Sequence, residues 1–271
     1  MKIKDYAVSG ELFELAYEES LDLWRTDPQP EELAPYYDSE GYISHTDSNE
    51  SLMDKVYQKV KKISLGRKVR LIGKLAKEKK TLLDVGAGTG DFLLTAKQKG
   101  WAIEGVEPSE MARQRAEAKG VTLLPELVKS NGKKYQIITL WHVLEHVRDV
   151  EGQIHILSSL LEPKGTLIVA VPNFKSYDAK IYKGFWAAYD VPRHLWHFSK
   201  GSIATLFERE KIKLIDTRPM IFDSFYVSIL SEKYQTGKNH FIRAFFNGLI
   251  SNISAWKTKE YSSIIYILQK K

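Results

Sequence analysis

The sequence predicts an α/β fold in which helices cover both faces of a doubly wound, mostly parallel sheet. Two observations predict this class. Between residues 81 and 219, short apolar runs typical of buried strands alternate with segments whose apolar residues recur at helical spacing. The run Thr81–Val85 also ends in a glycine-rich turn that leads directly into the helical segment 91–97. This order is typical of a β-α-β unit that binds its ligand beyond the carboxyl ends of the strands.

The turn after this first strand is predicted to bind a polar or anionic ligand. Glycines carry no side chain, so a ligand can approach their main chain closely. Backbone N–H groups at the start of a helix also attract negative and polar groups. The glycine spacing is G-x-G-x-G, which differs from the G-x-G-x-x-G spacing of dinucleotide-binding proteins. The residues predicted to contact the ligand here are Gly86, Ala87, Gly88 and Gly90.

The next predicted strand, residues 101–107, carries an acid at its carboxyl end. A carboxylate at this position can accept hydrogen bonds from both hydroxyls of a ribose. We therefore place Glu107, and Pro108 beside it, in the predicted cofactor site. Nicotinamide cofactors and S-adenosylmethionine both contain a ribose, so Glu107 by itself leaves both ligands open.

Three segments in register resemble the class I S-adenosylmethionine-dependent methyltransferases. Residues 84–90, Asp-Val-Gly-Ala-Gly-Thr-Gly, resemble motif I of that family, residues 135–147 its fourth strand and following loop, and residues 160–173 its fifth strand. Within the family the chain is most similar to the group related to ubiquinone-biosynthesis O-methyltransferases, over roughly residues 75–220. The resemblance implies S-adenosyl-L-methionine as the cofactor. It also implies a Rossmann-like sheet of about seven strands, with the last strand antiparallel.

The resemblance extends to individual site residues. It implies that Asp84, Trp141 and His142 lie near the cofactor and that the loop of His194 closes over the substrate. Methyl transfer requires the nucleophile to be held in line with the methyl group and, where needed, a group that accepts its proton. Histidine is the natural base near neutral pH, and we take His194 and His146 as the candidates. Roles in loop packing or helix capping stay open for both.

No metal site is predicted. His194 and His197 have the one-turn spacing of a metal pair, but the glutamate of the H-E-x-x-H pattern is missing and no third ligand is evident. The chain contains no cysteine, which excludes disulfides, thiolate ligands and the iron–sulfur cluster of radical enzymes. After the fourth predicted strand, residues 140–143 read Leu-Trp-His-Val. Enzymes that methylate the amino groups of bases usually have Asn/Asp-Pro-Pro-Tyr/Phe there, so the sequence argues against that class.

Residues 1–50 are predicted to form an acidic extension that covers the main domain. They carry three basic and thirteen acidic side chains, a net charge of −10, and several prolines that interrupt helices. Tyr42, in a tyrosine-rich stretch, is predicted to belong to a lid over the cofactor. The alternative is that these tyrosines only anchor the extension.

Residues 51–271 are predicted to be the methyltransferase domain. It begins with leading helices over residues 51–77, and residues 223–256 form a helical insertion before the last strand, which suggests a substrate wall or a homodimer surface. Residues beyond position 50 carry 37 basic and 21 acidic side chains, a net charge of +16. This excess attracts anionic substrates or nucleic acid, or it reflects solvated lysines on helix faces, which we favour.

The sequence thus predicts a cytoplasmic enzyme. The start of the chain has no apolar segment of signal-peptide type, and no run is long enough to span a membrane. We expect methyl transfer to an oxygen of a small-molecule or attached-metabolite acceptor by in-line displacement. The alternatives are a non-catalytic S-adenosylmethionine-binding protein and, less favoured, an RNA methyltransferase or an NAD-dependent oxidoreductase.

Overall fold

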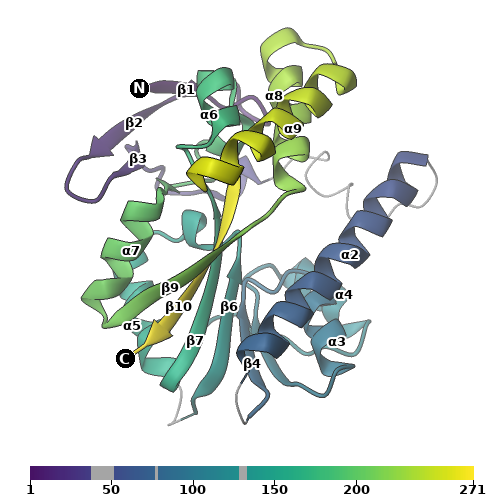
Figure 1. Cartoon of the computed structure of the whole chain (residues 1–271), viewed down its shortest axis with the longest axis vertical. Coiled ribbons are helices and arrows are strands. Elements are labelled where there is room, and N and C mark those ends of the chain that lie inside the picture. The colour runs from purple at the N-terminus through teal and green to yellow at the C-terminus, as the bar shows by residue number, and fades with distance from the viewer. Residues whose placement is uncertain (38–51, 77–78, 128–132) are drawn as a thin grey trace. The chain divides into compact units, whose positions relative to one another are not determined.

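A computed structural model describes residues 1–37, 52–76, 79–127 and 133–271, the side chains of residues 52–57 excepted (Figure 1). The chain divides into two compact units. Unit 1 comprises Met1–Ser39, His142–Ile154 and Val169–Leu268, and unit 2 comprises Glu40–Trp141, His155–Ile168 and Gln269–Lys271.

The larger sheet has six strands in the order β5-β4-β6-β7-β10-β9. It is mostly parallel with an antiparallel last strand and is flanked by helices, which confirms the predicted fold class. β4 pairs in parallel with both β5 and β6, so that Asp84 lies opposite Gly105 on one side and Thr139 on the other. The strands are β4 (Thr81–Val85), β5 (Ala102–Val106), β6 (Tyr135–Trp141), β7 (Leu161–Pro172), β9 (Ile212–Pro219) and β10 (Ser263–Lys270).

The sheet has six described strands where seven were expected, and the difference lies after the helix Glu110–Glu117. In that segment Leu124 makes a single parallel bridge to Val106, and the pairing does not extend into a strand. Pro125 follows directly and has no N–H group to donate to a ladder, which explains why pairing stops.

Two of the helices that accompany the sheet begin at a serine that caps them. Ser109 accepts a hydrogen bond from the Ala112 N–H at the start of α4, and Ser199 forms a reciprocal capping box with Ser202 at the start of α7. The central strands are buried along nearly their whole length, as expected for a sheet covered on both faces. These helices are α2 (Leu52–Leu75), α3 (Asp91–Lys97), α4 (Glu110–Glu117), α5 (Val150–Leu160) and α7 (Lys200–Arg209).

A second, four-stranded sheet was not predicted. The N-terminal segment forms three antiparallel strands, and the short strand β8 adds to them in the order β1-β2-β3-β8, all within unit 1. Trp24 of β3 lies opposite His197 of β8. The sequence did not indicate this sheet, because the alternation of apolar and polar residues in β2 is weak. In the structure only Leu15 of this strand is fully buried. The strands are β1 (Lys2–Lys4), β2 (Leu12–Glu18), β3 (Leu23–Asp27) and β8 (Trp196–His197).

The predicted helical insertion before the last strand is confirmed. It consists of α8 (Asp223–Thr236) and α9 (Phe241–Thr258), which pack against each other. No helix among the described residues is long and apolar enough to cross a membrane. The remaining short helical segments are η1 (Ala34–Tyr36), η2 (Leu144–His146), α6 (Tyr177–Tyr182), η3 (Lys183–Phe185) and η4 (Ala187–Tyr189).

Candidate active site

The glycine turn after β4 adopts a conformation that only glycine accepts readily. Gly86, Gly88 and Gly90 have φ values of 72°, 54° and 75°, in the left-handed region. A Cβ atom on Gly90 would lie 3.1 Å from the Cβ of Ala116, so this glycine also allows close packing on α4. A Cβ atom on Gly88 would meet nothing within 4 Å. The open side of the turn is therefore at Gly88, where a ligand has room to approach.

The N–H groups of the turn are already hydrogen-bonded. Gly86 and Ala87 donate to the carbonyl oxygen of Val106, at 2.8 and 2.9 Å, and Gly90 donates to the carbonyl oxygen of Ala87. These bonds hold the turn against the end of β5. The expectation that several free N–H groups point at a ligand therefore does not hold for these three residues.

Glu107 links the end of β5 to the glycine turn. Its Oε2 accepts a hydrogen bond from the Gly88 N–H at 2.8 Å, and its Oε1 accepts one from the Ser109 N–H at 3.0 Å. A carboxylate oxygen has further lone pairs, so both oxygens can still accept from hydroxyl groups. Pro108 beside it is held by Arg113, which donates to its carbonyl oxygen. The two hydrogen bonds fix the orientation of the Glu107 carboxylate beside the glycine turn.

Asp84 is buried beneath this turn. Its side chain is shielded from solvent, and the Thr139 hydroxyl on the neighbouring strand donates to Oδ1 at 2.6 Å. Burial raises the pKa of Asp84 to about 7, although the Thr139 hydrogen bond and the charge of Lys68 oppose the rise. The described contacts of Asp84 therefore join two strands.

Two features of unit 2 near these residues could not be read from the sequence. Asp91, in the first turn of α3, forms ion pairs of 2.7 Å with both Lys61 and Lys119. Trp141, at the end of β6, has the ammonium of Lys68 over its ring at 4.2 Å and contacts the edge of the Phe92 ring. Nothing in the local pattern indicates these partners, because each pair comes from separate elements.

His142, which follows β6, is bound by two carboxylates of unit 1. Its Nδ1 lies 3.2 Å from Oε1 of Glu145, and its Nε2 lies 3.1 Å from Oδ2 of Asp223. Burial opposes the charged form, but the hydrogen bonds to Asp223 and Glu145 outweigh it and raise the pKa of His142 to about 10. Near neutral pH this side chain is thus a cation that donates from both nitrogens.

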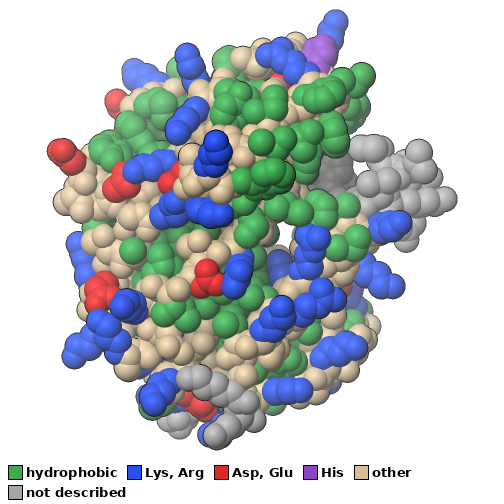
Figure 2. All heavy atoms as spheres, in the orientation of Figure 1, with side chains coloured by type: hydrophobic (Ala, Val, Ile, Leu, Met, Phe, Trp, Pro, Cys, Tyr) green, Lys and Arg blue, Asp and Glu red, His purple; other side chains and the backbone are tan. Residues whose placement is uncertain are grey.

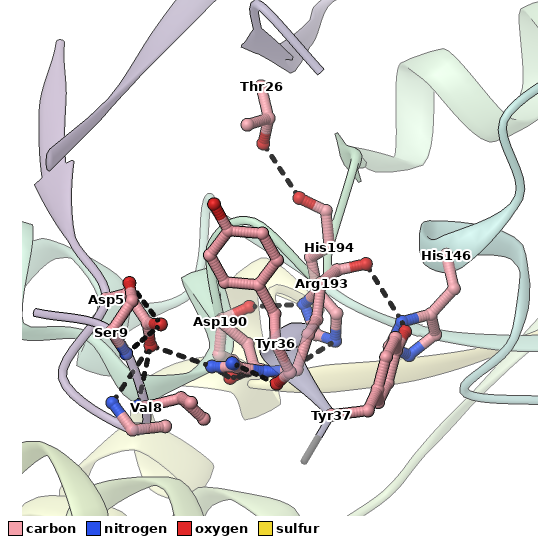
Figure 3. A network of polar contacts seen from close by, with 12 residues as sticks. Asp5, Val8, Ser9, Thr26, Tyr36, Tyr37, His146, Asp190, Arg193 and His194 are labelled. Carbon is pink, nitrogen blue, oxygen red and sulfur yellow. Dashed lines mark hydrogen bonds and ion pairs between the residues drawn. The ribbon is translucent and has the colours of Figure 1, made fainter. Parts of the chain in front are cut away.

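His146 and His194 lie side by side in unit 1, with ring centroids 4.6 Å apart (Figure 3). Nδ1 of His194 lies 2.9 Å from the carbonyl oxygen of Ala188, and Nδ1 of His146 lies 3.0 Å from the carbonyl oxygen of Arg193. A carbonyl oxygen can only accept, so in each neutral ring the proton sits on Nδ1 and the lone pair on Nε2. The structure thus brings together the two histidines that the sequence selected as bases.

The surroundings of His146 make it a weak base. Burial, together with the neighbouring His194, lowers the pKa of His146 to about 4. The Tyr37 hydroxyl also lies 3.0 Å from Nδ1 of this ring (Figure 3). His146 therefore stays neutral near pH 7 and is part of a hydrogen-bonded network.

Arg193 is the centre of that network. Its guanidinium is almost fully buried and pairs with Asp190 at 2.7 Å and with Asp5 at 3.0 Å, and it donates to the carbonyl oxygen of Tyr36 (Figure 3). Asp5 in turn accepts hydrogen bonds from the backbone N–H of Ser9. These contacts bind the N-terminal segment to the loop that carries His194.

Three side chains of unit 1 offer metal ligands close together. Glu145, His146 and His194 each place one ligand atom within 4.8 Å of the others. Two imidazoles and a carboxylate suit divalent transition metals, and Oε2 of Glu145 is buried without a hydrogen-bond partner among the described residues. His197, for which the sequence predicts no metal pair with His194, does not belong to this cluster, because its Nε2 faces the Thr26 hydroxyl at 3.3 Å.

One predicted site residue, Tyr42, lies outside the described residues. No contact can therefore be assigned to it, and its role in a lid stays a prediction.

Comparison with known proteins identifies the family. The methyltransferase domain family matches residues 53–213, more than half of the chain, and the chain belongs to this family. S-adenosyl-L-methionine is its cofactor, and the chain is an S-adenosylmethionine-dependent methyltransferase, as predicted.

Several relatives are named as O- or C-methyltransferases. A ubiquinone biosynthesis O-methyltransferase from Vibrio atlanticus is 28% identical over 175 residues, which cover 59% of this chain and 72% of the relative. The same enzyme from Actinobacillus pleuropneumoniae is 29% identical, and the match covers 45% of this chain and 58% of the relative. A C-methyltransferase from Streptomyces niveus is 26% identical, over 50% of this chain and 33% of the relative. The chain thus spans less than two thirds of the length of some of these relatives.

Solved structures agree on the fold. The magnesium protoporphyrin IX methyltransferase of Synechocystis, solved with S-adenosylhomocysteine, has a TM-score of 0.58 at 16% identity and covers 87% of this chain and 97% of its own. At this identity the likeness supports the fold and not the acceptor.

Proposed function

We propose that the chain transfers the methyl group of S-adenosyl-L-methionine to a hydroxyl oxygen of a small-molecule acceptor, with His194 as the base. The O-methyltransferase relatives support oxygen as the acceptor atom. The observation that carries the proposal is the state of His194, whose ring is anchored through Nδ1 to a backbone carbonyl and keeps a lone pair on Nε2.

The cofactor site in this proposal is formed by the strand ends of the larger sheet. Glu107 accepts hydrogen bonds from the ribose hydroxyls, and the open side of Gly88 leaves room for the ligand beside the turn. The other proposed cofactor residues are Asp84, Gly86, Ala87, Gly90, Pro108, Trp141, His142 and Tyr42.

When bound, S-adenosyl-L-methionine supplies a methyl group activated by its sulfonium. The protein must hold the acceptor hydroxyl in line with that group and take its proton. Nε2 of His194 accepts the proton, and the positive charge that develops on the ring is stabilised by the Ala188 carbonyl oxygen and by Asp190, whose Oδ2 lies 3.9 Å from Nε2. His146, whose pKa of about 4 makes it a poor base, positions the ring of His194 instead.

A His194→Gln variant tests this role. We expect its affinity for S-adenosylhomocysteine, measured by calorimetry, to change less than about twofold, and its kcat for a phenolic acceptor to fall by about 10² or more. His155→Gln, at an exposed position on α5, is the matched control and should keep both properties. The acceptor is found first by a labelled-methyl screen of phenols and catechols with the parent protein.

The outcomes separate the hypotheses. Equal kcat in the parent and His194→Gln would exclude His194 as the base while leaving methyl transfer intact. S-adenosylhomocysteine binding without methyl transfer to any compound of the labelled-methyl screen would favour a non-catalytic binding protein. NAD binding in place of S-adenosylhomocysteine would overturn the proposed function as a whole.

We also propose that the protein acts in the cytoplasm on a small acceptor and not on nucleic acid. The basic excess beyond residue 50 is consistent with solvated lysines, since many of them lie at helix ends and turns. The division into an acidic lid of residues 1–50 and a methyltransferase domain of residues 51–271 remains part of this proposal.

A further inference from the structure

Helix α9 exposes its large apolar side chains to solvent. Each of these side chains is between 36% and 77% exposed, and Tyr226 on the adjacent α8 is 58% exposed. Figure 2 shows hydrophobic side chains gathered over α8 and α9 in the upper part of the view. We call this set the α9 apolar face: Phe241, Ile242, Phe245, Phe246, Leu249, Ile250, Ile253 and Trp256.

The side of α9 that packs on the protein consists of small residues. The buried residues of the helix are Ala244, Gly248, Ser251 and Ala255. A Cβ atom on Gly248 would lie 3.0 Å from the carbonyl oxygen of Ser224, so the two helices approach closely at this point. A helix on the surface of a water-soluble protein normally turns its large apolar residues inward and its polar residues outward. Helix α9 instead turns its large apolar residues outward and its small residues inward.

Hydrogen bonds fix α9 in this orientation. The Ser251 hydroxyl donates to Oδ1 of Asp178 at 2.7 Å, and the Asn252 amide donates to the Ser224 hydroxyl at 2.8 Å. Asn247 donates to the Tyr182 hydroxyl at 2.8 Å. Rotating the helix to bury its apolar face would break all three contacts and leave buried polar groups without partners. The outward direction of the apolar face is therefore a stable feature of the fold.

Positive charge surrounds the apolar face. Between residues 224 and 259 the only acidic side chain is Glu232, which is fully buried and pairs with Arg243 at 3.2 Å. Lys and Arg side chains lie around the green area in Figure 2. The exposed basic residues of this segment are Lys233, Lys238, Arg243, Lys257 and Lys259.

We propose that the α9 apolar face docks on the surface of a lipid bilayer that contains anionic lipids. A helix with Phe, Leu and Trp on one face and basic residues beside it lies in the plane of the membrane interface, with its apolar side chains among the acyl chains and its cations at the headgroups. The helix has 18 residues and is about 27 Å long, and it does not span the membrane. A second copy of the chain on this face would bring like charges together, so an anionic bilayer is the complementary partner.

Vesicle sedimentation tests the proposal. We expect the parent protein to bind phosphatidylcholine vesicles containing phosphatidylglycerol at least about tenfold more tightly than vesicles of phosphatidylcholine alone. A Phe245→Ser/Phe246→Ser double variant should lose about tenfold or more of this binding. Ile215→Ser, at a similarly exposed apolar position on β9, is the matched control and should bind like the parent. A Lys257→Glu/Lys259→Glu variant should lose the preference for anionic vesicles.

Circular dichroism and S-adenosylhomocysteine affinity, unchanged in all three variants, show that the fold is retained. Vesicle binding by the double phenylalanine variant equal to that of the parent would overturn the proposal, as would failure of the parent to bind either vesicle. Light scattering that shows a dimer of the parent and a monomer of the double phenylalanine variant would assign the face to self-association instead. The proposal does not depend on the proposed function, because none of these readouts measures methyl transfer.

Discussion

Replacing Asp84 with Asn should remove a pH dependence of stability that this carboxyl imposes on the protein. Burial raises the pKa of Asp84 from its ordinary value of 3.8 to about 7. Between these values the folded protein holds a proton that the unfolded chain has released, so the free energy of unfolding falls as the pH rises through this window and is constant above it. The full shift corresponds to about 4 kcal/mol. Asn keeps an oxygen that accepts the Thr139 hydrogen bond but does not ionise.

Urea unfolding of the parent and Asp84→Asn at about pH 5 and about pH 8.5 measures the effect, because every other titrating group is shared and cancels in the difference. The free energy of unfolding of Asp84→Asn minus that of the parent should be about 3 kcal/mol larger at the higher pH than at the lower one. The change is smaller than the full shift because the lower pH already lies inside the window in which the parent loses stability. Thr139→Val removes a hydrogen bond that favours the charged carboxylate, and it should move the pH window upward. A difference between parent and Asp84→Asn that does not vary with pH would refute the reasoning.

Two further predictions follow from the glycine turn and from the buried arginine. Gly88→Ala and Gly90→Ala should each lower the free energy of unfolding by about 1–2 kcal/mol through their positive φ. The loss of stability should be greater for Gly90→Ala, because the added Cβ also crowds α4. The loss of S-adenosylmethionine affinity should be greater for Gly88→Ala, on the open side of the turn. Equal effects of the two variants in both assays would contradict this account. Arg193→Met should lower the free energy of unfolding by about 3–5 kcal/mol in urea titrations, because it leaves the buried Asp5 without its partner. The double variant Arg193→Met/Asp5→Asn should recover part of this loss, and no recovery would mean that the ion pair is not the cause.

Local patterns were sufficient to predict the elements of the larger sheet. The apolar run Thr81–Val85 and the glycine turn predict β4 and α3, since both signals lie within a few residues of each other. Helices α8 and α9 could be predicted for the same reason. In each case the information that determines the element is contained in the element itself.

Contacts between distant segments could not be predicted in this way. His142 is a cation because Asp223, 81 residues away in the chain, lies against it, and no spacing rule links the two. The four-stranded sheet likewise depends on the pairing of Trp24 with His197. The sequence did indicate His146 and His194 as separate candidate bases, but their tautomers depend on backbone carbonyl groups that only the folded chain brings into reach.

The ion pair between Asp5 and Arg193 has a consequence for the order in which the protein folds during synthesis. The two residues are separated by 188 positions, and the sheet of β1, β2 and β3 also receives its fourth strand only from Trp196–His197. At about 5–20 residues per second, the ribosome needs roughly 10–40 s to make the intervening chain. Strands β1 to β3 therefore leave the ribosome well before Arg193 and β8 are made, and during that interval the Asp5 carboxylate and the edge of β3 are exposed to the chaperones that bind nascent chains.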